Sequence, residues 1–178
     1  PSQADDIRDF QIEGMSIGDS LLDFFSEEEI KSKKKPLSLG GKKFYQWSKV
    51  GKLNNKTYEN VWLFFITDDE KYIIRTISGR NYYPNNINEC YDLQSDIANQ
   101  IEMIMDNVKK KGPRKGKNNN FPNGNSYKKE IGFDFEDKSF IRIVCYDYSK
   151  KDTNSLDRLS VQISTKEYNN WLRSKDKK

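Results

Sequence analysis

The chain of 178 residues contains no histidine. This absence excludes Ser-His-Asp and Cys-His catalysis, and it excludes every metal site built on imidazole ligands. Only two cysteines are present, so one chain cannot supply a metal site made of thiolates alone. A Gly-rich strand-to-helix turn that would hold a dinucleotide is also absent. We therefore expect neither a metal nor a cofactor, and any catalysis would have to use Asp, Glu, Tyr, Lys or Cys.

Long hydrophobic runs are missing as well. The longest, Val61 to Ile66, is far shorter than the roughly 20 residues that a membrane-spanning helix needs, so we expect no membrane span. Only 34% of the residues are apolar, but 13% are aromatic, and these large side chains can fill a core. We predict a single monomeric domain over residues 1–178, with disordered tails at 1–6 and 174–178.

The charge of the chain is balanced rather than strongly basic. The net charge of +4 arises from 31 basic and 27 acidic residues, and AT-biased coding explains the excess of lysine without any particular partner. We predict a long basic loop over 112–126. A polyanion such as nucleic acid is one candidate partner for the cationic run that leads into this loop, although a solvated loop is the simpler interpretation. The run consists of Lys109, Lys110, Lys111, Arg114, Lys115 and Lys117.

The first half of the chain predicts an antiparallel meander. Residues 42–49, 57–66 and 71–78 have strand patterns separated by short polar turns. The central strand is apolar at every position from Val61 to Ile66. A strand of this kind should be covered on both faces.

A long amphipathic helix is predicted from about Ile87 to Lys110. Its apolar positions recur at steps of three and four residues, and they include Cys90. The lysines at its end would complement the negative end of the helix dipole.

Three further strands are predicted at 127–135, 141–145 and 159–163, because apolar and polar residues alternate there. A last helix should follow the capping pattern Ser164-x-x-Glu167. The predicted fold class is therefore α+β, with an antiparallel sheet of two three-strand meanders packed against one long helix and short terminal helices.

The two cysteines are predicted to meet. Cys90 lies on the apolar side of the long helix, and Cys145 lies on the same strand face as Ile141 and Ile143. These faces should pack together, and in an exported protein the two thiols should form a disulfide that adds roughly 4 kcal/mol in the chain-entropy model. The alternative is a pair of buried, reduced thiols that pack as small hydrophobic groups.

The opening stretch from Asp9 to Lys31 has the densest local pattern. Ser16-x-x-Asp19 and Ser26-x-x-Glu29 have the spacing of helix capping boxes. They predict a strand, a tight turn and two short helices. Ahead of them, Ser2-Gln3-Ala4 has the small-x-small form that precedes a signal-peptidase cut. The alternative is that the sequence begins there at an arbitrary boundary. We expect a periplasmic or secreted protein whose signal peptide was removed upstream of residue 5.

The segment IEGMSIGDSLLDFF, together with the second helix and the meander that follow it, resembles the periplasmic modules of the BamE/SmpA and β-lactamase-inhibitor-protein-like class. The resemblance covers about residues 12 to 79. The chain is also similar to small exported bacterial proteins. These resemblances imply an envelope or secreted location and protein-binding or scaffolding work without catalysis.

Two further groups of side chains are candidate sites. One is a set of tyrosines that could line a small-molecule or sugar-binding surface or pack at sheet edges, namely Tyr82, Tyr83, Tyr146 and Tyr148. The other is a set of carboxylates that could form a glycosidase-type pair, although turns and strand ends explain them more simply; these are Asp134, Glu136, Asp137 and Asp147.

From these observations we predict a non-catalytic exported protein that binds another protein or an envelope component. One alternative is a nucleic-acid- or polyanion-binding protein that uses residues 109–117. The other alternative is a carboxylate-based hydrolase.

Overall fold

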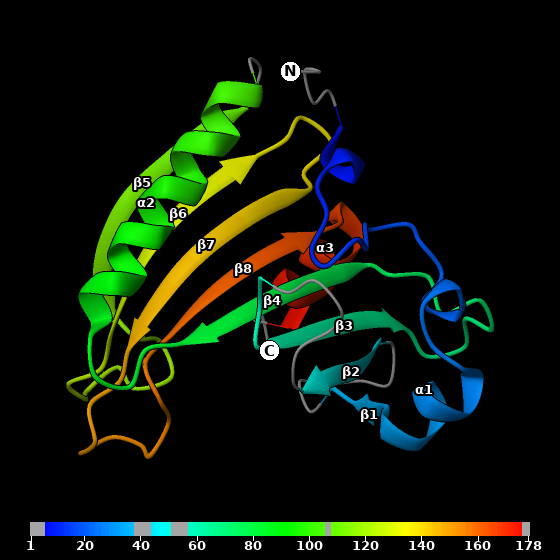
Figure 1. Cartoon of the computed structure of the whole chain (residues 1–178), viewed down its shortest axis with the longest axis horizontal. Helices are drawn as coiled ribbons and strands as arrows, with labels where there is room; N and C mark the ends of the chain where they lie inside the picture. Colours follow the sequence, from blue (N-terminus) through cyan, green and yellow to red (C-terminus); the bar gives the residue numbers. More distant parts are fainter. Residues whose placement is uncertain (1–5, 38–43, 51–56, 106–107, 176–178) are drawn as a thin grey trace.

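The computed structural model describes residues 6–37, 44–50, 57–105 and 108–175. Within these ranges eight strands form one antiparallel sheet, in the order β1-β2-β3-β4-β8-β7-β6-β5 (Figure 1). The strands are β1 (Lys35–Pro36), β2 (Phe44–Val50), β3 (Asn60–Ile66), β4 (Thr76–Tyr82), β5 (Lys109–Lys117), β6 (Tyr127–Asp134), β7 (Phe140–Asp147) and β8 (Arg158–Ser164). The α+β class is confirmed, but the prediction of two three-strand meanders is wrong.

Strands β4 and β8 join the two halves of the chain into one sheet. They pair along their whole length, from Thr76 opposite Ser164 to Tyr82 opposite Arg158. In two separate meanders each of them would be an edge strand with a row of unpaired backbone N–H and C=O groups. Their pairing removes both edges, which explains why the two predicted meanders merge.

Five helical segments accompany the sheet within the described ranges: the 3-10 helices η1 (Ile7–Asp9) and η2 (Leu21–Asp23), and the α-helices α1 (Glu27–Lys33), α2 (Ile87–Ile104) and α3 (Lys166–Lys175). Helix α2 is the long helix of the prediction, but it ends at Ile104 rather than at Lys110. Met105 is already extended, and Lys109 to Lys111 belong to strand β5. The predicted contact of these lysines with the helix dipole is therefore wrong.

Both faces of the sheet carry packed elements. Helix α2 contacts β6, β7 and β8 on one face, and the N-terminal segment continues the same core over β2 to β4. Helix α3 packs on the opposite face, where Figure 1 shows it behind the strands. Strand β3 lies between these two layers: Leu63 and Phe65 belong to the main core, and Phe64 packs with Tyr168 and Trp171 of α3. The prediction that this strand is covered on both faces is confirmed.

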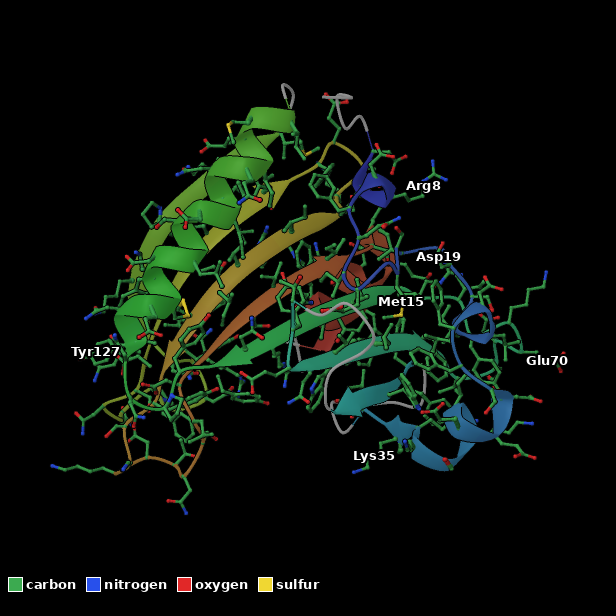
Figure 2. All side chains as sticks on the ribbon, in the orientation of Figure 1. Arg8, Met15, Asp19, Lys35, Glu70 and Tyr127 are labelled. Atoms are coloured by element: carbon green, nitrogen blue, oxygen red, sulfur yellow. A yellow bond between two sulfur atoms is a disulfide. The ribbon has the colours of Figure 1, made fainter. Side chains whose placement is uncertain are left out.

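The N-terminal segment follows its predicted pattern only in part (Figure 2, in which Met15 and Asp19 are labelled). Ile12 and Met15 form a β-bridge across a tight turn. The Asp19 carboxylate accepts from the Ser16 N–H at 2.7 Å, but no helix begins there. The helical turn that follows this motif, η2, begins after Ser20, whose hydroxyl accepts from the Leu22 N–H. Helix α1 begins after the predicted cap Ser26.

The predicted tails lie largely outside the described residues. Asp6 is described, and its carboxylate caps η1 by accepting from the Arg8 N–H. At the other end, α3 runs to Lys175. None of the helices in the described ranges is long and apolar enough to cross a membrane.

Candidate binding face of the sheet

Strand register divides the side chains of the sheet between two faces, because successive residues of a strand point to opposite sides. We call the side that packs on α2 the helix face and the other side the open face. Rows of cross-strand neighbours define the open face. Three rows run from β3 through β4, β8, β7 and β6 to β5: Asn60, Arg80, Ser160, Val144, Glu130 and Arg114; Trp62, Ser78, Gln162, Arg142, Gly132 and Lys111; and Phe64, Thr76, Ser164, Phe140, Asp134 and Lys109. A fourth row begins at β4 and contains Tyr82, Arg158, Tyr146 and Lys128.

Small hydroxyl side chains occupy the middle of the open face. Thr76 and Ser164 hydrogen-bond to each other at 2.9 Å, and Ser78 and Ser160 do so at 3.0 Å. All four residues are buried. Because each hydroxyl has a partner, these short side chains are satisfied without water.

Two arginines lie against aromatic rings on this face. The guanidinium carbon of Arg80 is 3.8 Å from the centroid of the Trp62 ring. The guanidinium carbon of Arg158 is 4.8 Å from the ring of Tyr146 and 5.1 Å from the ring of Tyr148. These two tyrosine rings are themselves stacked, with centroids 5.8 Å apart and planes 11° apart. We call these five residues the arginine–aromatic cluster.

The positive charge of this cluster is not neutralised within the described residues. Arg80 and Arg158 are half-buried, and neither forms an ion pair with any carboxylate in the described ranges. The Nε atoms of both are buried and have no hydrogen-bond partner there. Burial, and then the nearby charge of Arg158, lower the pKa of Arg80 to about 10. A pair of cations held in this way favours an anion above it.

A second group of charges on the open face is neutralised internally. Arg142 and Lys111 both donate to the Asp134 carboxylate. Arg142 also lies 3.6 Å from Glu130, which pairs with Lys128 at 3.2 Å. Partial burial pushes the pKa of Asp134 upward, but the hydrogen bonds from Lys111 and Arg142 outweigh it, and the pKa lies below its ordinary value. These ion pairs leave the arginine–aromatic cluster as the stronger candidate for an anionic ligand.

The six cations predicted as one basic run are divided between the two faces. Residues 109–117 form the edge strand β5 rather than part of a loop, so the predicted loop over 112–126 is wrong in its first half. Lys109, Lys111 and Arg114 pair with open-face positions, whereas Lys110, Lys115 and Lys117 lie on the helix face.

The helix-face members of this run have contacts of their own. Lys110 binds Glu102 of α2. Lys115 lies over the ring of Tyr91 at 5.6 Å, and Lys117 lies over the ring of Tyr127 at 4.7 Å. Tyr127 is labelled in Figure 2 near the N-terminal end of α2. The predicted polyanion site of six charges is therefore not one patch, and binding of nucleic acid through it stays a prediction.

A half-open cleft of about 630 Å³ lies between the start of β5, the β6–β7 turn and α3. Its walls mix cationic, acidic and amide side chains: Lys109, Lys111, Asp134, Phe135, Glu136, Lys138, Ser139, Asn169, Asn170 and Arg173. No member of the arginine–aromatic cluster lines it. The mixture of charges does not select one class of ligand.

The carboxylates considered for hydrolysis do not form one group: Asp134 and Glu136 both line the cleft, whereas Asp147 lies at the other end of the β6–β7 ladder. Asp134 and Asp147 lie at opposite ends of the β6–β7 ladder. Asp134 is opposite Phe140, and Asp147 is opposite Tyr127. At the rise of a strand these ends are about 24 Å apart, well beyond the separation of about 5–10 Å that glycosidases use. Asp137 accepts from the Ser139 N–H at 2.8 Å and so caps a turn. Across the described residues no group of three acidic or cysteine side chains could hold a metal ion.

The predicted disulfide is confirmed, and it lies on the helix face. Cys90 of α2 and Cys145 of β7 are bonded, with their Cα atoms 6.0 Å apart, and both are fully buried. One turn further along α2, the buried Gln94 amide donates to the carbonyls of Lys129 at 2.8 Å and Ile143 at 2.7 Å. The covalent bond and the amide together fix α2 to β6 and β7, and neither occupies the open face.

Sequence patterns located part of the cluster. Tyr146 and Tyr148 were candidates for a binding surface, and they belong to the cluster. Tyr82, a third candidate, lies on the other side of Arg158 from Tyr146. Trp62, Arg80 and Arg158 were missed. The sequence pattern that could have indicated the two arginines is the polar side of strands β4 and β8, where each arginine lies two residues from a serine. Only the pairing of β4 with β8 brings these positions together.

Comparison of the chain with models of known protein families found no match, and comparisons with curated proteins and with solved structures found none either. The candidate site therefore has to be judged on its own chemistry.

Proposed function

We propose that this is an exported, non-catalytic binding protein that holds an acidic component of the cell envelope on the open face of its sheet. The observation that carries the proposal is the arginine–aromatic cluster, in which Arg80 and Arg158 have no carboxylate partner among the described residues. Keeping two cations half-buried and unpaired has a free-energy cost. That cost is understandable if an anionic partner supplies the missing charge.

The disulfide supports the exported location in this proposal. Disulfides persist in the periplasm and outside the cell and are rare in the reducing cytosol. The resemblance of residues 12–79 to BamE-like modules points to the same compartment and to a binding role, and it remains part of the proposal.

The aromatic rings favour an acidic polysaccharide of the envelope as the ligand over an anion that makes ionic contacts alone. Trp62, Tyr146 and Tyr148 place apolar ring surface beside the two guanidiniums. Such a surface offers contact area to the C–H face of a sugar while the arginines bind its charged groups.

The test is binding of polygalacturonate, a polymer with one carboxylate in each sugar unit, with neutral dextran as the comparison polymer. We expect binding that weakens as salt rises from about 0.05 to about 0.3 M, because the contact is between charges. The double variant R80Q/R158Q should lose at least about 10-fold in affinity for each arginine, since a charge-assisted hydrogen bond contributes about 1.5 kcal/mol or more.

The matched control removes the same net charge from the other face. In K110Q/K115Q both lost cations belong to the helix-face side of β5, so polygalacturonate binding should stay within about 2-fold of the unmodified protein after correction for long-range charge. Equal losses in the two double variants would mean that net charge, and not the cluster, drives binding. Selective loss in K110Q/K115Q would favour the basic strand as the polyanion site.

A further inference from the structure

The arginine–aromatic cluster has the charge and the geometry of a subsite for one small anionic group. Tyr82 is directly opposite Arg158, and Arg80 is directly opposite Ser160. Arg80 and Arg158 are therefore diagonal neighbours on adjacent strands, at a separation of about 7–8 Å. The charge of Arg158 also contributes to lowering the pKa of Arg80, so the two guanidiniums lie within electrostatic reach of each other.

Ring stacking fixes how these two guanidiniums are presented. A guanidinium that lies on an aromatic face has its plane set by that face, and its N–H groups point outward within the plane. The buried Nε atoms of Arg80 and Arg158 have no partner in the described residues. The rings hold these arginines, and within the described part of the chain no ion pair uses their donors.

Charge complementarity then selects the ligand group. Two cations without a carboxylate match a group that carries two negative charges. A carboxylate carries only one, and so does a sulfate ester. A phosphate monoester carries about −1.5 to −2 at pH 7 and has three acceptor oxygens, and arginine binds such oxygens in pairs.

We infer that Arg80 and Arg158 together form a subsite for a phosphate monoester group of the ligand, with each guanidinium donating to oxygens of the same phosphate. This inference rests on the proposed function, because it specifies the acidic group that the open face binds. The aromatic rings beside the arginines then contact the part of the ligand that carries the phosphate.

The first experiment measures binding of inorganic phosphate, sulfate and acetate to the purified protein by calorimetry. At pH 7.5 we expect phosphate and sulfate to compete for one site and to bind at least about 10-fold more tightly than acetate, because each additional charge-assisted contact contributes about 1.5 kcal/mol. R80Q and R158Q should each abolish this preference. The matched control R114Q removes an arginine from the same face, and it should keep the preference. Equal affinities for the three anions in the unmodified protein would overturn the inference.

The second experiment uses the titration of phosphate itself. The second pKa of a phosphate monoester such as glucose 6-phosphate is near 6, so on going from pH 7.5 to pH 5 most of its doubly charged form disappears and its affinity should fall about 10-fold. Sulfate stays doubly charged over this range, and its affinity should not change. A parallel loss for both anions would show that a protein group titrates and would contradict the inference.

The groups that face the subsite justify sulfate as the reference. They are Arg80 and Tyr82 from β4, Arg158 from β8, Tyr146 and then Tyr148 from β7, and Glu130 and Lys128 from β6. Arginine, lysine and tyrosine ordinarily titrate at about 10 or above, and carboxylates near 4. Burial raises the pKa of nearby Asp157, which accepts from the Tyr148 N–H, and the sulfate measurement accounts for any titration of that group.

The source of the phosphate and the independence of the two proposals are tested last. Glucose 6-phosphate represents a phosphorylated glycan, and vesicles with phosphatidic acid represent a lipid. Binding of either above the level of acetate or neutral vesicles supports the subsite and identifies the source. If neither binds while polygalacturonate still binds through Arg80 and Arg158, the phosphate inference fails and the proposed function stands. If polygalacturonate binding is also insensitive to both arginines, the two fail together.

Discussion

On the helix face of the sheet the buried amide of Gln94 donates to strand carbonyls, whereas on the open face two half-buried arginines have no carboxylate partner within the described residues. Gln94 is fully buried under α2, and its amide bridges two strand carbonyls. On the open face Arg80 and Arg158 have aromatic neighbours but no carboxylate partner among the residues that the structure describes. The contrast indicates that Gln94 stabilises the packing of α2 on the sheet, whereas Arg80 and Arg158 keep positive charge that no described carboxylate neutralises.

Removal of the disulfide should have the largest effect on stability. The cross-link joins residues separated by 55 positions, and the chain-entropy model assigns about 4 kcal/mol to a loop of that length. We expect C90A, C145A and the double variant to lose similar amounts of unfolding free energy in urea, because either single change already removes the bond.

Non-additivity is the control in this experiment. If the two thiols packed independently, the losses of the single variants would add up in the double variant. Counting thiols in the denatured, unreduced protein should give none, and two free thiols would contradict the bond directly.

The Gln94 amide should have the next largest effect. Gln94→Ala removes both hydrogen bonds to strand carbonyls from a buried site, and we expect a loss of about 1–3 kcal/mol in unfolding free energy. The exposed Gln100 on the same helix is the matched control, and Gln100→Ala should change stability by less than about 0.5 kcal/mol. Equal effects at both positions would mean that the buried bridge contributes nothing specific.

The sequence predicts features that depend on residues close together in the chain better than features that depend on residues far apart. The α2 face, the β6 to β8 alternation and the Cys90–Cys145 pairing were predicted, because each depends on local periodicity and on the packing of one helix on one strand face. These are the features of the helix face.

The open face was mostly missed, for a physical reason. It exists because β4 pairs with β8, which are separated by 76 positions or more in the chain, and strand patterns do not specify partners over such a distance. Strand β5 was missed as well. Its lysines have low strand propensity, and it forms because β6 offers an edge to pair with.

Lowering the pH should reduce the unfolding free energy of the protein, because Asp134 on the open face becomes protonated. The folded-state pKa of Asp134 lies below its ordinary value, because hydrogen bonds from Lys111 and Arg142 outweigh the opposing effect of partial burial. A carboxyl of this kind contributes stability above its unfolded pKa of about 3.9, and that contribution is lost as pH falls through the folded pKa. We expect unfolding midpoints in urea to drop between pH 5 and pH 3 in the unmodified protein, and to drop less in D134N.

A second variant separates this ion pair from general acid effects. K111Q keeps the carboxylate but removes one of its two donors, so its pH dependence should lie between those of D134N and the unmodified protein. Identical pH profiles in all three proteins would contradict a role for this cluster in acid sensitivity.

The smallest effect is expected for the hydroxyl pair beneath the two arginines. Ser78 and Ser160 are buried and hydrogen-bond only to each other within the described residues. Removing both partners of a buried hydrogen bond can be nearly neutral, whereas removing one leaves the other unsatisfied at a cost of about 1–3 kcal/mol. We therefore expect S78A and S160A each to lose more unfolding free energy than S78A/S160A, which should stay within about 0.5 kcal/mol of the unmodified protein. The double variant should also keep its affinity for anions, since the guanidiniums are held by the rings of Trp62 and Tyr146. A large loss of affinity in the double variant, with stability unchanged, would show that the serines belong to the binding site and that stacking alone does not position the arginines.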